Sequence, residues 1–126
     1  MNFENVYFIT STAYAGKSTM VKLLAQKFDG IACEENYHDV LLPELDAKEF
    51  PCVTYTRDLQ DWHEFIRRSP QEYKDWIDGA ARECEILELR ILEDMLKNPE
   101  TQNKKICHFI ITNSTHRIKF IFFHIF

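Results

Sequence analysis

The chain has 126 residues, of which 45% are hydrophobic and 28% charged, and it carries a formal net charge of −5. This length and composition predict one compact domain over residues 1–126 and exclude a fibrous repeat or a largely disordered chain. An acidic balance without a basic stripe argues against a nucleic-acid partner.

The first predicted elements are a strand over residues 6–10 and a helix from Lys17 to about Lys27. The strand is apolar on both faces, which is typical of a central strand in a parallel sheet. We expect Gly30 to end the helix. The side chains that this helix is expected to bury are Met20, Val21, Leu23, Leu24 and Phe28.

Residues 11–19, between this strand and helix, read STAYAGKST. Such a turn binds phosphate because its backbone N–H groups and the positive helix end face the anion, a lysine neutralises charge, and a hydroxyl ligates Mg²⁺. The alternative is a chance Gly-Lys-Ser tripeptide on an ordinary turn. The flanking elements favour a nucleoside triphosphate site that includes Mg²⁺ on Ser18. Its predicted nucleotide-binding residues are Ala13, Tyr14, Ala15, Gly16, Lys17 and Ser18.

A second short strand is predicted at residues 31–33, and it runs directly into the acidic residues Glu34 and Glu35. Ligands of open α/β sheets bind beyond the carboxyl ends of the strands, so these two carboxylates are candidate site residues. A solvated acidic turn is an equally weighted alternative. His38, a few residues later, has no partner at a diagnostic spacing and is interpreted as a surface or core residue.

Apolar residues at helical spacing predict a helix near residues 59–66, ending at Arg67 and Arg68. The two arginines would clamp an anionic acceptor, although basic residues at a helix end also complement the helix dipole, and that account is favoured. A capping box at residues 69–72 then starts a long helix that closes at residues 98–99. Its predicted apolar stripe is Tyr73, Trp76, Ala80, Cys84, Leu87, Ile91 and Met95.

Residues 105–126 differ from the rest of the chain, because all twenty acidic residues lie at or before Glu100. Strands are predicted at 106–112 and 118–126. Two interpretations stay open for this change of composition: a pair of buried strands, or a reading frame altered or cut short near Lys105.

The four cysteines are widely spaced and form no Cys-x-x-Cys pair. Without a secretory signal or a long apolar segment, they are predicted to be reduced thiols in a cytoplasmic protein with no membrane partner.

The segment 11–19 resembles the Walker A pattern of the P-loop NTPases, with Ser11 where that family has its leading glycine. Beyond it, residues 5–112 look like the small-molecule kinases of the superfamily, the shikimate-kinase-like and nucleotide-kinase-like branch. The resemblance implies an α/β three-layer sandwich around a mostly parallel sheet, here incomplete at the C-terminal end if the chain is shortened. It also implies that the protein binds ATP and Mg²⁺.

Carried over residue by residue, Lys17 would stabilise charge on the transferring phosphoryl group, Ser18 would ligate Mg²⁺, and Thr19 would hydrogen-bond the α-phosphate. Glu34 or Glu35 would take the acceptor-side carboxylate position. The segment that includes Arg67 and Arg68, followed by Glu72, is loosely similar to the substrate-contact segment of the shikimate kinases.

The expected function is therefore ATP-dependent phosphoryl transfer to a small metabolite. The alternative is a nucleotide-binding module or truncated kinase fragment without turnover, because the third strand offers only Asn113 where the family has an acidic residue, and no arginine-rich lid follows. A GTPase-like switch is disfavoured, because no Asn-Lys-x-Asp segment follows the loop. A sheet edge left exposed by missing strands would favour a homodimer.

Overall fold

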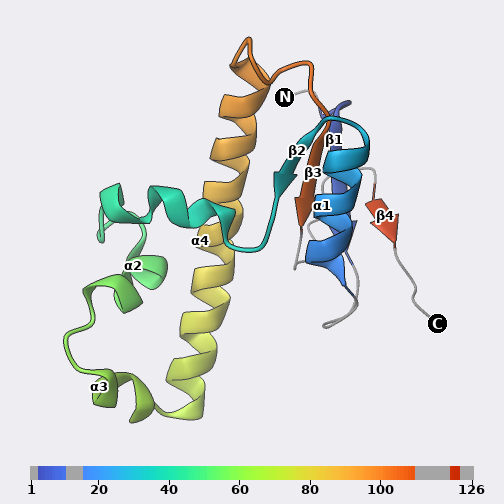
Figure 1. The fold of residues 1–126 in the computed structure, drawn as a ribbon. Helices are drawn as coiled ribbons and strands as arrows, with labels where there is room; N and C mark the ends of the chain where they lie inside the picture. The colour runs from blue at the N-terminus through green and yellow to red at the C-terminus, as the bar shows by residue number, and fades with distance from the viewer. Residues whose placement is uncertain (1–2, 11–15, 110–119, 123–126) are drawn as a thin grey trace. The chain divides into compact units, whose positions relative to one another are not determined.

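The computed structural model describes residues 3–10, 16–109 and 120–122 (Figure 1). Its contacts divide the chain into two compact units. The first unit consists of Met1–Tyr37 and Glu93–Phe126, and the second is His38–Leu92. The second unit thus interrupts the sequence of the first. A single nucleotide-binding domain over 1–126 stays a prediction.

The first unit contains a parallel sheet of strands β1 (Val6–Thr10), β2 (Ile31–Cys33), β3 (Ile106–Phe109) and β4 (Phe120–Phe122), in the order β2-β3-β1-β4. β1 pairs in parallel with β3 on one side and with β4 on the other. The prediction of a central parallel strand at 6–10 is therefore confirmed. Parallel strands are also present within both segments that the sequence predicted near the C-terminus.

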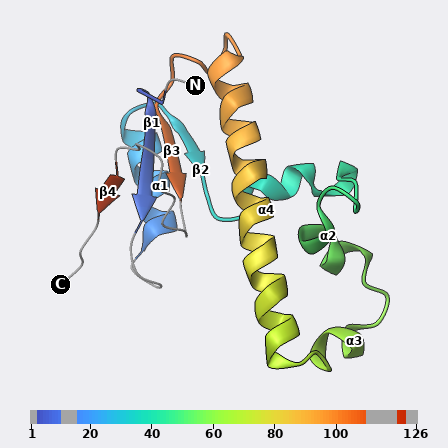
Figure 2. The ribbon, with the colours of Figure 1, turned by 180° about the vertical axis from the view of Figure 1, so that it is seen from behind.

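Helix α1 (Lys17–Lys27) covers one face of the sheet, lying in front of the strands in Figure 1 and behind them in Figure 2. Ile9, Val21, Ala25 and Cys107 form its buried contact with the sheet. Val21 and Ala25 are one helical turn apart, so the buried stripe is narrow. The predicted burial of two side chains was wrong, because Leu23 points away from this stripe and Phe28 lies beyond the helix end, and they are 53% and 47% exposed.

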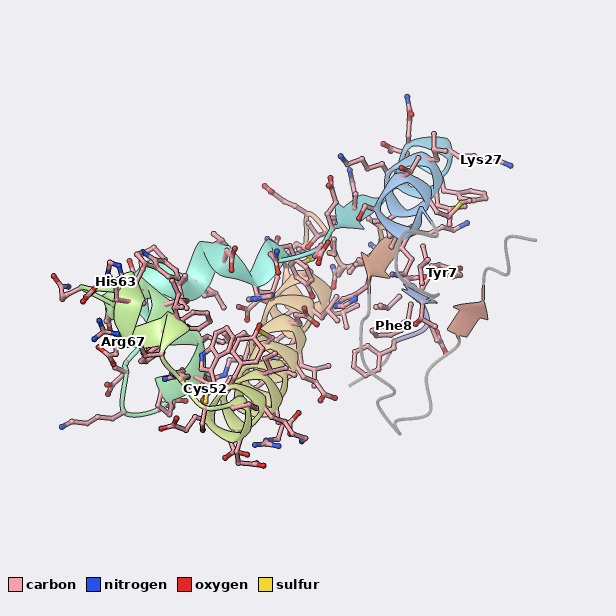
Figure 3. All side chains as sticks on the ribbon, turned by 90° about the horizontal axis from the view of Figure 1, so that it is seen from below. Tyr7, Phe8, Lys27, Cys52, His63 and Arg67 are labelled. Carbon is pink, nitrogen blue, oxygen red and sulfur yellow. The ribbon has the colours of Figure 1, made fainter. Side chains whose placement is uncertain are left out.

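The opposite face of the sheet is also buried. Side chains alternate along a strand, and Tyr7 and Phe8 point to opposite sides of β1 (Figure 3). The ring of Phe8 contacts the rings of Phe3 and His108, with centroids 6.0 and 5.1 Å apart. Cys33 on β2 approaches Met95, with the two sulfur atoms 4.0 Å apart. Both faces of β1 thus carry buried side chains, Val6 and Phe8 on one and Ile9 on the other, as its apolar sequence predicted.

The second unit is helical. It contains most of a 3₁₀ helix, η1 (Tyr37–Glu44), then α2 (Pro51–Asp58), α3 (Trp62–Ile66) and most of α4 (Pro70–Lys97). The helix predicted near 59–66 starts later than expected, because Leu59 is extended and Asp61 caps α3 by accepting the His63 N–H. The sequence analysis missed α2 entirely.

The start of α4 is confirmed in detail. The backbone N–H of Ser69 donates to the Glu72 carboxylate (2.8 Å), and the N–H of Glu72 donates to the Ser69 hydroxyl (3.2 Å). The predicted apolar stripe is buried only in part. Leu87 is 1% exposed, whereas Tyr73 is 44% exposed.

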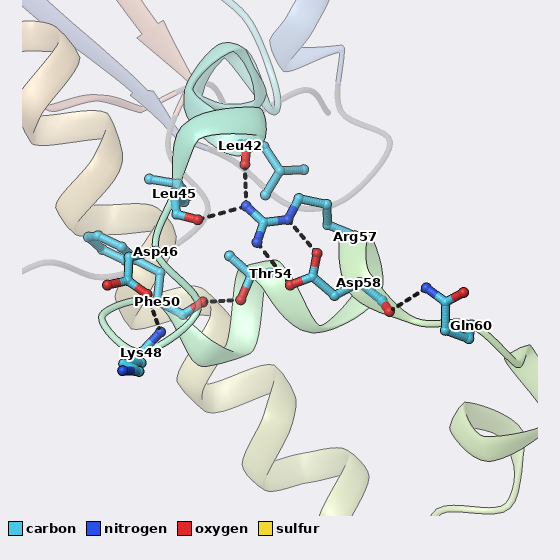
Figure 4. Close-up of polar contacts among 9 residues, drawn as sticks. All are labelled: Leu42, Leu45, Asp46, Lys48, Phe50, Thr54, Arg57, Asp58 and Gln60. Atoms are coloured by element: carbon cyan, nitrogen blue, oxygen red, sulfur yellow. Dashed lines mark hydrogen bonds and ion pairs between the residues drawn. The ribbon is translucent and has the colours of Figure 1, made fainter.

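Arg57 of α2 forms hydrogen bonds with the backbone at the end of η1 (Figure 4). Its Nη1 donates to the carbonyl oxygens of Leu42 and Leu45, at 2.7 and 2.8 Å. Nε and Nη2 donate to the two carboxylate oxygens of Asp58, which lowers the pKa of that carboxyl. A planar guanidinium makes these four contacts at once, which an ammonium cannot do.

Gly30 has a different role from the one predicted. The left-handed residue after α1 is Asp29, with φ 48°, whereas Gly30 donates its N–H to Ala25 O and precedes β2. A Cβ on Gly30 would overlap the backbone carbonyl of Lys105, the same group that accepts the Ile31 N–H at 2.8 Å. Glycine is therefore needed for the close approach of two chain segments.

We expect Gly30→Ala to lower the free energy of unfolding by about 1–3 kcal/mol, because overpacking against a backbone group cannot be relieved by a side-chain rotation. Urea denaturation measures the change. The control is Gly79→Ala in α4, whose Cβ would meet the side chain of Cys52 and no backbone group among the described residues, and it should cost less. An equal or larger loss for the Gly79 variant would contradict this account.

Candidate functional site

The candidate phosphate site lies at the carboxyl end of β1. β1 is followed in the chain by α1 and then by β2, which lies at one edge of the sheet. β3 comes next in the chain and lies between β2 and β1. β4 then lies on the other side of β1. The strand order therefore changes direction around β1. In open α/β sheets, ligands bind beyond the strand ends at such a switch point.

Gly16 forms the N-cap of α1 and has φ 83° and ψ 24°, a left-handed conformation. Its carbonyl accepts the N–H of Met20 at 2.9 Å, so α1 is regular from its first turn. Glycine carries no side-chain oxygen to cap the helix, and the first turn of α1 contains no acidic residue. The first N–H groups of a helix have no intrahelical acceptors and carry its positive dipole end, so this terminus is suited to an anion.

The predicted binding residues that the structure describes lie together in this first turn. Lys17 and Ser18 are half-buried, and Thr19 is exposed. Ala13, Tyr14 and Ala15 lie outside the described residues. Their roles in binding phosphate stay predictions, and Ser11 also lies outside the described residues.

We expect Gly16→Ala to destabilise the protein by about 1–2 kcal/mol, because a Cβ is strained at positive φ. The strain comes from the backbone alone, because among the described residues no heavy atom lies within 4 Å of an added Cβ. Thermal and urea unfolding measure the loss. Gly16→Asn is the control and should cost less, because asparagine tolerates this conformation. If the Gly16→Ala variant were as stable as the wild-type protein, this would contradict the left-handed conformation of Gly16.

Glu34 follows β2 and forms an ion pair with Lys22 of α1 (3.1 Å), in which both side chains are well exposed. β3 separates β2 from β1, which places the two outer strands of this trio about 10 Å apart. Glu35 is exposed, and the turn is closed by the Tyr37 N–H donating to Glu34 O. These contacts favour the solvated acidic turn, and catalysis by Glu34 or acceptor binding by Glu35 stays a prediction.

Arg67 and Arg68 belong to the second unit. Arg67 caps the end of α3, where its N–H donates to His63 O at 3.0 Å, and its side chain is exposed (Figure 3). The guanidinium carbon of Arg68 lies 3.9 Å from the centroid of the Tyr55 ring. Arg68 lines a pocket of about 360 Å³ with Pro51, Cys52, Tyr55, Glu72, Asp75 and Trp76.

This pocket contains two carboxylates beside one guanidinium, and that charge balance does not favour an anionic acceptor. Arg67 at the C-cap agrees with the helix-dipole account of the arginine pair. Binding of an acceptor by Arg67 and Arg68 stays a prediction.

Sequence reasoning missed a polar cluster made by His38, Cys84 and Glu88. His38 is only 8% exposed. Its Nε2 lies 3.2 Å from Cys84 Sγ, and its Nδ1 lies 3.3 Å from Glu88 Oε1. The sequence contains only a weak indication of this cluster. Cys84 and Glu88 share a face of α4 at i, i+4, but His38 comes from η1, 46 residues away from Cys84.

Within residues 3–10, 16–109 and 120–122, no three His, Cys, Asp or Glu side chains are grouped as a metal site. In the same part of the chain, no helix is both long and apolar enough to cross a membrane. None of the four cysteines, all of which are among these residues, forms a disulfide. Comparisons with protein-family models, curated proteins and solved structures find no match.

Proposed function

We propose that the turn between β1 and α1 binds Mg-ATP and that the protein transfers the γ-phosphoryl group to a small hydroxyl-bearing metabolite. One observation carries the proposal: a left-handed Gly16, followed by Lys17 and Ser18, begins α1 at the switch point of a parallel sheet. Phosphate sites of the P-loop type combine these same features.

The residues in the first turn of α1 are suited to this chemistry. The N–H groups of the first turn would hold phosphate oxygens, and the Lys17 ammonium would neutralise charge that develops during transfer. The Ser18 hydroxyl would ligate Mg²⁺, and Thr19 would hydrogen-bond the α-phosphate. Mg²⁺ takes few ligands from protein side chains and completes its shell with phosphate and water. A bound Mg²⁺ would neutralise charge on the phosphates.

The arrangement of the first unit supports a three-layer, P-loop-like fold. α1 covers one face of the sheet, and Met95, in the last turn of α4, approaches Cys33 of β2. The helical unit His38–Leu92 is inserted between β2 and β3. The resemblance to small-molecule kinases implies acceptor-side residues that follow the second strand in the chain, and the insertion begins there in the sequence.

The second candidate function is nucleotide binding without turnover. The observation that favours it is the position of Glu34, whose carboxylate is exposed and contacts Lys22 on a solvated turn. A screen with ATP labelled at the γ-phosphate and a panel of small hydroxyl compounds separates the two functions. Label on any acceptor supports the kinase. Nucleotide binding with no transfer to any compound supports the binding module.

A further inference from the structure

His38, Cys84 and Glu88 have the arrangement of an activated nucleophile. A thiol lies within hydrogen-bond reach of an imidazole, and a carboxylate contacts the other nitrogen of the same ring. This is the general geometry by which enzymes activate a cysteine. Asp39 Oδ1 is a second carboxylate contact of the ring, 3.6 Å from His38 Nε2.

We propose that Cys84 is a modification site for peroxides, with the thiolate as nucleophile, His38 as its proton partner and Glu88 as the residue that positions the ring. Cys84 is half-buried rather than buried, so the residue keeps some contact with solvent. Nothing in the nucleotide proposal uses these three residues.

The protonation of His38 supports modification rather than hydrolysis. Hydrogen bonds to Cys84 and then Glu88 raise the pKa of His38 from 6.5 to about 10, against the lowering effect of burial. The imidazole therefore keeps its proton at neutral pH and presents a cation to the sulfur. Acid–base catalysis of acyl transfer works best with a group that releases its proton near the operating pH, which His38 does not do.

Atoms and electrons balance in the proposed step. The Cys84 thiolate attacks one oxygen of hydrogen peroxide, an S–O bond forms, and the O–O bond breaks. The leaving hydroxide takes the proton from His38 Nε2 and becomes water. The sulfur is oxidised by two electrons to sulfenic acid and the peroxide is reduced, after which His38 regains a proton from solvent. Sulfenic acid is the reversible first stage of cysteine oxidation.

Cys52 provides a control within the same molecule. It is also half-buried, but its neighbour is the Glu83 carboxylate, which accepts the Cys52 N–H at 2.9 Å. Burial and this negative charge raise the pKa of the Cys52 thiol. The two cysteines lie in separate tryptic peptides, 83–90 for Cys84 and 49–57 for Cys52.

The test treats the intact protein with hydrogen peroxide and dimedone at pH 6, and mass spectrometry follows both peptides. An ordinary thiol is about 0.3% thiolate at this pH. Only Cys84 has an imidazole and a carboxylate beyond it placed to activate the sulfur, so we expect Cys84 to be labelled at least about tenfold faster than Cys52. Equal rates at the two cysteines would overturn the proposal.

Two variants separate activation from simple exposure. His38→Gln should reduce the Cys84 rate to that of Cys52 while the Cys52 rate stays the same. Glu88→Gln, which keeps the size of the side chain, should reduce the Cys84 rate while the Cys52 rate stays the same, because the imidazole loses the carboxylate that contacts its Nδ1. A preference for Cys84 that survives His38→Gln would contradict the assignment. If His38→Gln fails to fold, the proposal is tested by Glu88→Gln and by the ratio of the Cys84 and Cys52 labelling rates in the wild-type protein.

Discussion

Replacing Lys17 with alanine is expected to raise the dissociation constant for Mg-ATP about 10- to 100-fold, because hydrogen bonds to charged groups contribute about 1.5–3 kcal/mol and each 1.4 kcal/mol is tenfold. Lys17 is the first residue of α1, directly after the left-handed Gly16. A lysine at this position neutralises the β- and γ-phosphates in P-loop sites. Isothermal titration of the wild-type protein and the variant measures the change.

Lys22→Ala is the matched control, because it removes the same charge from the same helix. Lys22 pairs with Glu34 at an exposed position, and such pairs contribute little. Its affinity for Mg-ATP should stay within about threefold of the wild-type value, since a distant exposed charge acts only through screened electrostatics. Equal effects of the two variants would show that net charge, rather than the position of Lys17, governs binding.

The second large effect is expected from Ile9→Ala, which should lower the free energy of unfolding by about 2–5 kcal/mol. Ile9 is fully buried in the central strand and packs with Val21, Ala25 and Cys107 between the sheet and α1. The variant loses burial and leaves a cavity beneath the helix that carries Lys17. Small domains have only about 5–15 kcal/mol of stability, so this loss is a large fraction. Urea denaturation followed by circular dichroism measures it.

Ile9→Val is the control for cavity size, and its expected cost is about 0.5–1.5 kcal/mol. A second comparison uses Leu23→Ala on the same helix. Leu23 is 53% exposed, so its truncation should change stability only slightly. A Leu23→Ala loss as large as that of Ile9→Ala would contradict the described packing of α1.

Elements with strong local signals could be predicted from the sequence. The apolar run of β1 identified a strand buried on both faces, and the capping box formed by Ser69 and Glu72 fixed the start of α4. In each case the residues that determine the element are close together in the chain, so a short window contains the whole signal.

The features that could not be predicted depend on tertiary contacts. Leu23 has the same character as its buried neighbours, and only the position of the sheet determines that it is exposed. α2 begins at Pro51 and has Glu83, from another helix, as acceptor for the N–H groups of Cys52 and Val53. A capping residue some thirty positions away leaves no local signal.

The same difference between local and tertiary contacts explains why one candidate site could be predicted from the sequence and the other could not. Gly16, Lys17 and Ser18 are consecutive, so a short motif is enough to indicate a phosphate site. His38 meets Cys84 and Glu88 only through the packing of η1 on α4. From the sequence alone, His38 is therefore interpreted as an ordinary surface or core residue.

The most direct test of the central claim is a nuclear magnetic resonance titration of the isotope-labelled protein with Mg-ATP, followed at the backbone amides. The account predicts that the largest shifts occur at Gly16, Lys17 and Ser18, that they saturate with one nucleotide per chain, and that Lys17→Ala weakens them. Amide signals of these three residues that do not move at saturating Mg-ATP would contradict the account.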